Sequence, residues 1–252
     1  MNKSCTIILI IFFIILVVLY LVYYAVSKDI YGSTEKINEF FGRYCKNQEI
    51  FDPKDFYWTK NFRNSWMNIK EEYLNYVDKY TIPMHKEVNS IVASCDINNR
   101  WKTLYLRTFG KDTGLAKYFP TTMSLINQCP CTLAFFSILE PGAKLSPHIG
   151  IYKGVIRYHL ALIVPNQWEK CFIDVNGKRL YWTEGSDIMF DDMFMHYAEN
   201  NTNQSRVVLF LDIKRDFNNI FLDSINSIFL KFVKSNDVLN NMVNNINLYA
   251  PQ

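Results

Sequence analysis

The pattern of hydrophobic and polar positions divides the chain into three parts. Residues 6–26 form an uninterrupted apolar and aromatic run with one Thr and no charge, long enough for a helix to cross a bilayer. Between residues 29 and 99, apolar residues recur at steps of three and four among charged ones, which predicts amphipathic helices. From residue 132 onward the period changes to two, which predicts β-strands.

The predicted strands are short and are separated by turn signals. Pro141-Gly142 ends one strand, and Asn176-Gly177 is a strong signal for a two-residue hairpin. Many short strands with tight turns predict an antiparallel barrel or double sheet. The expected strands are 101–106, 132–140, 155–164, 171–175, 178–182, 187–190 and 206–213.

Helices are expected on both sides of these strands. The first begins near residues 33–37, where Thr34 is the predicted cap, and a short one covers 122–127. The last helical stretch, 217–247, places one apolar face toward the protein. That face comprises Ile220, Phe221, Ile225, Ile228, Phe229 and Phe232. The resulting divisions are an anchor (1–27), a helical part (28–100), a β core (101–216) and C-terminal helices (217–252).

The apolar run at 6–26 favours an uncleaved anchor over a signal peptide. Ala25-Val26-Ser27 has cleavage-like spacing, but the run exceeds the usual signal-peptide core of roughly 7–15 residues. The formal net charge of +3, with no basic run, argues against nucleic acid as a partner. The six cysteines contain no CxxC pair. They are equally compatible with one or two disulfides in an oxidising compartment and with buried free thiols.

Polar residues interrupt the apolar strands of the β core in a way that indicates a site. His148 and His196 each lie at the edge of an apolar run, and Arg157, His159 and Arg206 lie within or at the start of others. A buried Arg or His needs a partner, and the simplest partners are a metal ion for some and a small dianion for the others. The His-x-Asp/Glu…His pattern of non-haem iron sites is incomplete, because Gly150 stands in the acidic position.

Asp191 and Asp192 admit three interpretations. The first is that they are turn residues at a strand end. The second is that they accept hydrogen bonds that orient His196, and the third is that one of them binds iron directly. Lys153-Gly154 is expected to form a turn, with Lys153 near the mouth of a substrate site.

Several stretches together resemble one known family. They read FSILEPGAKLSPHIG (136–150), RYHLALIVP (157–165), WTEG (182–185) and FDDMFMHYAEN (190–200), followed by Arg206, with weaker upstream likeness in 56–72 and 101–110. The chain resembles the aspartyl/asparaginyl β-hydroxylases, a family of Fe(II)- and 2-oxoglutarate-dependent oxygenases. That family carries Gly where other such oxygenases have the acidic ligand, and its members often have one N-terminal membrane anchor. Gly150 and residues 1–27 fit both features.

The resemblance implies a fold and a set of site residues. The fold would be a double-stranded β-helix, a jelly-roll or cupin-like barrel, with flanking helices and one N-terminal transmembrane helix. His148 and His196 would bind Fe(II), and Ser137, Arg157, His159 and Arg206 would bind 2-oxoglutarate, with O₂ as the oxidant. Arg suits such a pocket because its planar fork binds a carboxylate through two parallel hydrogen bonds.

The substrate is expected to be the β-carbon of Asp or Asn in a protein or peptide. One alternative is a lipid acyl chain, which free thiols and a cytosolic domain would favour. Another is a non-catalytic barrel that only binds a ligand, although all six metal and co-substrate residues are present. Lys3 before the anchor and the family's topology predict a single-pass type II protein with its domain in the secretory lumen. The sequons at Asn200 and Asn203 matter only in that case.

Overall fold

The computed structural model describes residues 28–45, 47–88 and 93–251, together with the single positions 5, 12, 13, 20 and 24. Among these residues, no helix has the length and apolar character needed to span a membrane. The anchor predicted for residues 1–27 falls mostly outside the described residues, and it stays a prediction.

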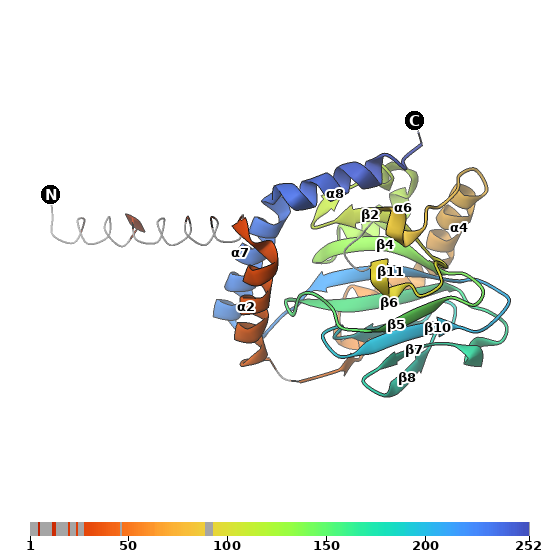
Figure 1. Ribbon diagram of the computed structural model, residues 1–252, viewed down its shortest axis with the longest axis horizontal. Helices are drawn as coiled ribbons and strands as arrows, with labels where there is room; N and C mark the ends of the chain where they lie inside the picture. The colour runs from red at the N-terminus through yellow and green to blue at the C-terminus, as the bar shows by residue number, and fades with distance from the viewer. Residues whose placement is uncertain are drawn as a thin grey trace.

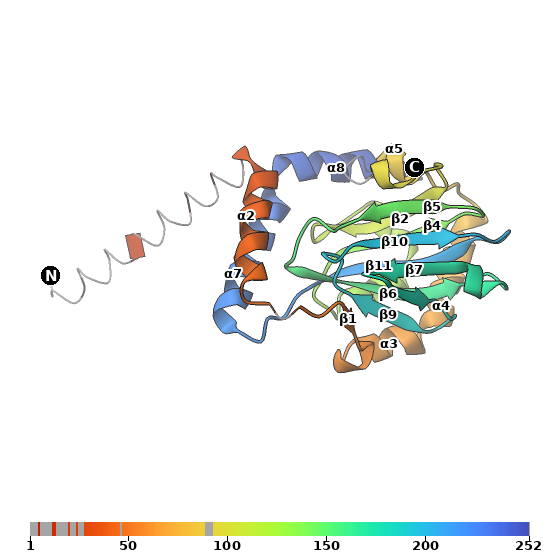
Figure 2. The same ribbon diagram turned by 60° about the horizontal axis from the view of Figure 1, so that its bottom comes forward.

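Two antiparallel sheets form the centre of the molecule (Figures 1 and 2). The seven-stranded sheet has the order β1-β9-β6-β11-β4-β2-β3, and the four-stranded sheet has the order β5-β10-β7-β8. The strands are β1 Ile50–Phe51, β2 Trp101–Thr108, β3 Lys111–Asp112, β4 Cys131–Leu139, β5 Lys144–His148, β6 Val155–Ile163, β7 Cys171–Val175, β8 Lys178–Tyr181, β9 Asp187–Phe190, β10 His196–Asn200 and β11 Arg206–Lys214.

The strand order is that of a jelly roll. The eight strands β4 to β11 can be renumbered 1 to 8 in chain order. The larger sheet then contains the order 6-3-8-1, and the smaller sheet has the order 2-7-4-5. The chain therefore crosses repeatedly between the sheets, as two interleaved Greek keys do. The predicted double-stranded β-helix is confirmed, and each predicted strand is present within a few residues of its expected bounds.

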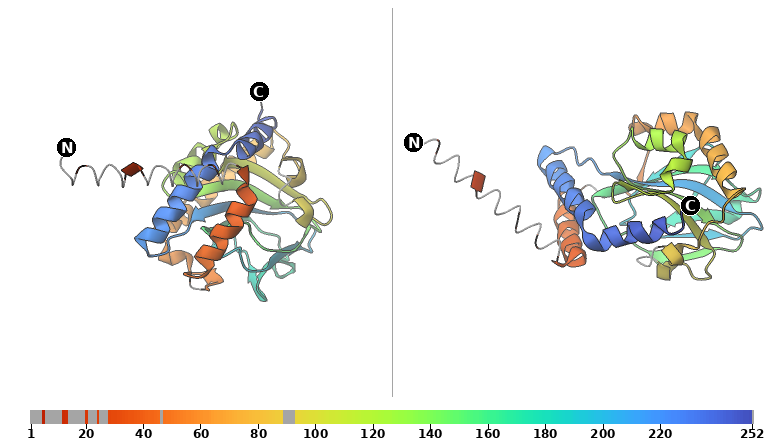
Figure 3. Two further views of the ribbon diagram at one scale, coloured as in Figure 1. Left: turned by 60° about the vertical axis from the view of Figure 1, so that its left-hand side comes forward. Right: turned by 90° about the horizontal axis from the view of Figure 1, so that it is seen from above.

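Helices cover the outer face of the larger sheet and one end of the barrel (Figure 3). They are α2 Ile30–Gly42, α3 Thr59–Asn64, α4 Trp66–Val77, α5 His85–Val88, α6 Pro120–Ile126, α7 Ile220–Ser235 and α8 Asp237–Asn247, with the 3-10 turns η1 Pro53–Asp55, η2 Ala93–Cys95, η3 Ala116–Tyr118 and η4 Trp168–Lys170.

The alternation of side chains along β4 separates the core from the site. Phe136 points outward and packs against Tyr73 of α4, with ring centroids 5.2 Å apart. Its neighbours Phe135 and Ser137 point to the other face and line an internal cavity. Because successive residues of a strand face opposite ways, one strand contributes both to the main hydrophobic core and to the cavity wall.

The predicted start of the first helix is wrong. Helix α2 begins at Ile30, and the side chain of Asp29 caps it by accepting a hydrogen bond from Gly32 N at 2.8 Å. Thr34 lies inside the helix, where its hydroxyl donates to the carbonyl of Ile30. Asp29 is an equally good cap one turn earlier, and the helix uses the earlier one.

The predicted buried face of the last helical stretch is also largely wrong. Ile220 and Phe221 are 87% and 65% exposed, whereas α7 buries Leu222, Asn226, Phe229 and Val233. Phe229 and Val233 form a small hydrophobic cluster of their own with Ile30 and Ile37 of α2 and with Phe109. Helix α7 thus packs on α2, a partner that its own periodicity does not reveal.

Candidate active site

A cavity of about 430 Å³ extends from the interior of the jelly roll to the helices α2 and α7. The larger sheet contributes β4, β6 and β11 to its wall, and the smaller sheet contributes β5 and β10. The structure brings seven of the eight predicted site residues to this cavity: Ser137, His148, Arg157, His159, Asp192, His196 and Arg206. Asp191 does not line it.

His148 and His196 face each other across two paired strands. They are register partners in the β5–β10 ladder, and their ring centroids are 4.3 Å apart. The Nδ1 atom of His148 lies 2.7 Å from the carbonyl of Ser146, and that of His196 lies 2.9 Å from the carbonyl of Phe194. These carbonyls require Nδ1 to carry the hydrogen, which leaves both Nε2 lone pairs available for a metal ion.

Both imidazoles are held in the neutral form that binds metals. Burial lowers the pKa of His148, and burial together with the nearby Arg157 lowers the pKa of His196 to about 3. A metal ligand must be deprotonated at Nε2, so this pair needs no proton release near neutral pH. The Nη1 atom of Arg157 lies 3.5 Å from His196 Nε2 and would have to shift when a metal binds there.

Asp192 fills the space that a side chain at position 150 would occupy. Gly150 N donates to the carbonyl of Asp192 at 2.6 Å, and a Cβ on Gly150 would overlap the Asp192 carboxylate. Oδ2 of Asp192 pairs with Arg157 at 2.7 Å, while Oδ1 is buried without a hydrogen-bond partner. Burial raises the pKa of Asp192 to about 7 although Arg157 opposes the shift.

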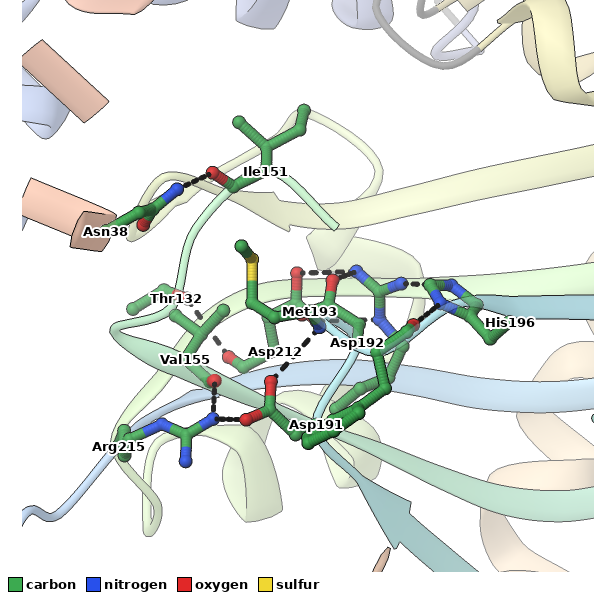
Figure 4. A network of polar contacts seen from close by, with 12 residues as sticks. Asn38, Thr132, Ile151, Val155, Asp191, Asp192, Met193, His196, Asp212 and Arg215 are labelled. Carbon is green, nitrogen blue, oxygen red and sulfur yellow. Dashed lines mark hydrogen bonds and ion pairs between the residues drawn. The ribbon is translucent and has the colours of Figure 1, made fainter. Parts of the chain in front are cut away.

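The two neighbouring aspartates have different surroundings (Figure 4). Asp191 points away from the histidines and forms ion pairs with Arg215 at 2.6 Å and Lys153 at 3.1 Å. Its other oxygen accepts from Met193 N at 3.0 Å. Asp191 therefore fixes the scaffold behind the site, and only Asp192 is placed to act beside His196. Lys153 is 8% exposed, so its predicted position at a substrate mouth is wrong.

Arg157 lies between two carboxylates. Its guanidinium contacts Asp192 at 2.7 Å and Asp212 at 3.1 Å, and it lies 4.4 Å from the centroid of the Phe210 ring. The two acids raise the pKa of Arg157, and the group stays charged. Arg157 is thus already neutralised, and a bound dicarboxylate would have to share it.

Arg206 has no such neutralising partner. It is 2% exposed, and no carboxylate of the described residues forms an ion pair with it. Nη1 donates to the carbonyl of Ser137 at 3.2 Å, Nε has no partner, and the guanidinium lies 4.4 Å from the centroid of the Trp182 ring. Burial lowers its pKa to about 10, which keeps it charged near neutral pH. A buried cation without a counter-ion is costly, and this one indicates an anionic ligand.

Other unpartnered polar atoms surround Arg206. Both ring nitrogens of His159 and the Nε1 of Trp182 are buried without hydrogen bonds, and the two rings stack with centroids 6.2 Å apart. Ser137 Oγ accepts from Trp101 Nε1 at 3.0 Å, which leaves its own hydroxyl hydrogen to donate. Buried polar groups are normally satisfied, so this cluster fits the carboxylate of a small ligand.

Sequence reasoning missed Trp182 and Asp212 as site residues. Asp212 is an acid in an otherwise apolar strand, the same signal that identified Arg157, and β6–β11 pairing places the two directly opposite each other. Trp182 carried no chemical signal of its own. Its role becomes visible only when the fold stacks it on Arg206.

The donor set fits iron and a dicarboxylate. Within the described ranges, no group of three or more His, Cys, Asp and Glu side chains is arranged to hold a metal ion. The candidate metal centre is the facing His148–His196 pair, with Asp192 in the same cavity. The unpartnered cluster around Arg206 is suited to an anion in the same cavity.

Comparison with known proteins identifies the family. A model described as aspartyl/asparaginyl beta-hydroxylase matches residues 63–216, which is more than half of the chain. The chain belongs to the aspartyl/asparaginyl β-hydroxylase family. The match contains all eight predicted site residues and ends before α7.

Curated relatives within this family differ in their named substrates. An ornithine lipid ester-linked acyl 2-hydroxylase from Rhizobium tropici is 35% identical over 175 residues, covering 68% of this chain and 62% of that protein. The human aspartyl/asparaginyl beta-hydroxylase is 27% identical over 178 residues, covering 67% of this chain and 23% of that protein. The chain thus spans less than two thirds of either relative.

Solved structures show only a weak likeness. A predicted oxalate decarboxylase from Thermotoga maritima has a TM-score of 0.32 and 17% identity, with 46% of this chain and 81% of that chain covered. A cupin 2 conserved barrel protein from Salinispora arenicola has a TM-score of 0.32 and 10% identity, with 52% and 86% covered. The jelly-roll assignment rests on the strand order described above.

Proposed function

We propose that the protein is an Fe(II)- and 2-oxoglutarate-dependent hydroxylase. The observation that carries this proposal is that Arg206, buried without a counter-ion, shares one cavity with a pair of histidines whose Nδ1 atoms are held by backbone carbonyls. With O₂ and 2-oxoglutarate, a bound iron would supply the oxidation of an unactivated C–H bond. The family membership of the chain supports a hydroxylase, and the cofactors are part of the proposal.

Each residue of the site would have a distinct role in binding iron or 2-oxoglutarate. His148 and His196 would hold the iron through Nε2, oriented by their carbonyl acceptors. Arg206 would bind the far carboxylate of 2-oxoglutarate through two parallel hydrogen bonds, with Ser137 and His159 as further donors. Asp192, whose Oδ1 is unpartnered, would accept a hydrogen bond from a group at the metal.

The cavity favours a lipid acyl chain over a peptide as the substrate. Its outer wall consists largely of hydrocarbon, from residues such as Ile149, Tyr152, Phe109 and Leu230. A peptide would bring backbone amides that this wall cannot satisfy, at a cost of about 1–3 kcal/mol each. The Rhizobium relative, named as a lipid acyl hydroxylase, supports the same choice.

Hydroxylation of Asp or Asn in a protein remains the second candidate, and the human relative's name supports it. The experiment that separates the candidates supplies the purified full-length protein with Fe(II), 2-oxoglutarate and O₂. Anionic phospholipid vesicles or an Asn/Asp-containing peptide is the acceptor. We expect the lipid acyl chain to gain one oxygen atom and succinate to form in equal amount. Binding of 2-oxoglutarate without any turnover on either acceptor would instead indicate a non-catalytic binding barrel.

We also propose that residues 1–27 anchor the protein in a membrane as a single-pass type II protein with a lumenal domain. The two sequons provide unequal tests. Asn200 is fully buried, and its side-chain amide donates to the carbonyls of Leu139, Glu140 and Gln204. Asn203 is exposed and is the accessible acceptor. A glycan that is lost in Asn203→Gln is expected for a lumenal domain, and digestion of the domain by protease outside sealed microsomes would refute that orientation.

A further inference from the structure

The outer part of the cavity is built by helices that the family match does not include. Helix α2 contributes Ile30, Tyr31 and Thr34, and α7 contributes Phe229, Leu230 and Val233. Both helices lie outside residues 63–216, and Figure 3 shows them side by side across one end of the barrel. The chain therefore extends the cavity of the shared domain with a wall of its own.

Helix α2 is fixed directly to the loop that follows the metal-site strand. Asn38 Nδ2 donates to the carbonyl of Ile151 at 2.7 Å (Figure 4). Its Oδ1 accepts from Lys153 N at 2.8 Å. This loop carries Gly150, beside the candidate metal site, and the side chains of Ile149 and Ile151. The two Ile side chains line the cavity yet remain 52% and 44% exposed. The apolar wall thus continues from His148 to α2.

Three lysines line the same outer part of the cavity. They are Lys214, Lys231 and Lys234, and none of them forms an ion pair with a carboxylate of the described chain. Lys231 and Lys234 are exposed on α7, and Lys214 Nζ donates only to Ser227 Oγ at 3.0 Å. The acids of the cavity wall, Asp192 and Asp212, both contact Arg157 at its inner end. The outer end therefore combines hydrocarbon with uncompensated positive charge.

We propose that α2 and α7 form a channel for one acyl chain of an anionic membrane lipid, with its headgroup at Lys231 and Lys234. This inference rests on the proposed hydroxylase function and assigns its substrate a binding site. Three features specify the occupant: continuity with the metal site, an apolar wall, and cationic groups at the outer end. In addition, α2 begins directly after the apolar run 6–26, which would place the channel entrance beside a bilayer.

The first test blocks the channel without touching the metal site. Leu230→Trp adds bulk to a half-buried side chain that lines the channel, and Ile228→Trp is its matched control, because Ile228 lies on the same helix and does not line the cavity. The probe is cis-parinaric acid, whose fluorescence rises in an apolar site, titrated into the full-length protein in detergent micelles. We expect Leu230→Trp to weaken binding about tenfold or more and Ile228→Trp to leave it within about twofold.

The second test examines whether Lys231 and Lys234 bind the headgroup. Both side chains are exposed, so their substitution does not disturb the packing of the protein interior. Lys231→Glu/Lys234→Glu changes two exposed side chains, with Lys36→Glu on α2 as the control for surface charge. At low salt we expect the double variant to bind parinaric acid about fivefold more weakly. It should bind the uncharged methyl ester like the wild type. Equal loss for the acid and the ester, or no loss for either, would overturn the headgroup assignment.

The outcomes separate this inference from the proposed function. If Leu230→Trp binds parinaric acid like the wild type, the channel is wrong, whatever the enzyme does. If the wild type binds the probe but never converts 2-oxoglutarate to succinate, the channel stands as a lipid site and the hydroxylase proposal fails. A third outcome is that parinaric acid does not bind, that an Asn/Asp peptide is hydroxylated, and that Leu230→Trp lowers this turnover. The channel would then accept a peptide, and its assignment to an acyl chain would be overturned.

Discussion

Arg206 and Arg215 are both buried guanidinium groups, 2% and 4% exposed, but only one has a counter-ion. Arg215 pairs with Asp191 at 2.6 Å and donates through Nε to the carbonyl of Lys153 at 2.8 Å. Arg206 meets a carbonyl, an aromatic ring and the uncharged Cys171 thiol instead. The first arrangement is complete within the protein, whereas the second requires a ligand to complete it.

This difference predicts the effect of Arg206→Ala. The variant should raise the Michaelis constant for 2-oxoglutarate more than about tenfold, because a buried charge-assisted contact contributes on the order of 2–5 kcal/mol. Iron affinity should hardly change, since Arg206 does not contact either histidine. Arg206→Lys should restore only part of the loss, because lysine keeps the positive charge but lacks the planar guanidinium that binds a carboxylate through two hydrogen bonds. If Arg206→Ala had the same Michaelis constant for 2-oxoglutarate as the wild type, the pocket would be misassigned.

Asp191 and Asp192 should respond differently to the same substitution. Asp191→Asn leaves Lys153 and Arg215 buried without a counter-ion and should lower the free energy of unfolding by about 3–5 kcal/mol. Asp192→Asn keeps the bulk beside Gly150 and should retain iron and most stability while it lowers turnover. Chemical denaturation and iron content measure the two effects. Loss of iron from Asp192→Asn would mean that this carboxylate is itself a ligand.

Some site residues are visible in the sequence and others are not, for a physical reason. His148, His196, Arg157 and Arg206 stand out because polar groups in apolar strands need partners. The identity of those partners depends on strand register, which pairs Arg157 with Asp212. The sequence therefore shows that Arg157 must be neutralised, and only the fold shows that the protein itself does so.

At the scale of elements, the strands were predictable and the helix contacts were not. Alternation and turn residues locate each strand, because both signals are local. Helix α7 has apolar residues on more than one face, and the tertiary partner decides which face is buried. Asn226 illustrates this choice: it is fully buried, donates to the carbonyls of Gly154 and Arg215, and accepts from the Tyr152 hydroxyl.

Asn226→Ala should therefore loosen α7 from the barrel. The change removes the side-chain partner of the Arg215 carbonyl and of the Tyr152 hydroxyl, at a cost of about 1–3 kcal/mol. We expect faster amide hydrogen exchange across Ile220–Ser235 with little change in the sheets. Ser224→Ala is the control on the same helix, because Ser224 is exposed and bonds only to the carbonyl of Ile220. Equal exchange in the two variants would show that Asn226 does not hold the helix.

At the scale of the whole molecule, the order of strands is the part that local pattern cannot supply. A period of two identifies strands but not their neighbours, and here successive strands mostly alternate between two sheets. The likeness of residues 136–206 to a known family supplied that order, and the structure confirms it. The layer of α2 and α7 lies outside that likeness, which is why the extent of the cavity was not foreseen.

Iron binding and 2-oxoglutarate turnover, measured in the wild type, His148→Ala and His196→Ala, are the most direct test of the metal site. The protein is loaded with Fe(II) without oxygen, its iron content and circular dichroism are recorded, and succinate is measured after oxygen is admitted. We predict one iron per wild-type chain with succinate formation, and neither in the two folded variants, because each keeps only one imidazole ligand. Full iron content and full succinate formation in either variant would contradict the metal site and the function built on it.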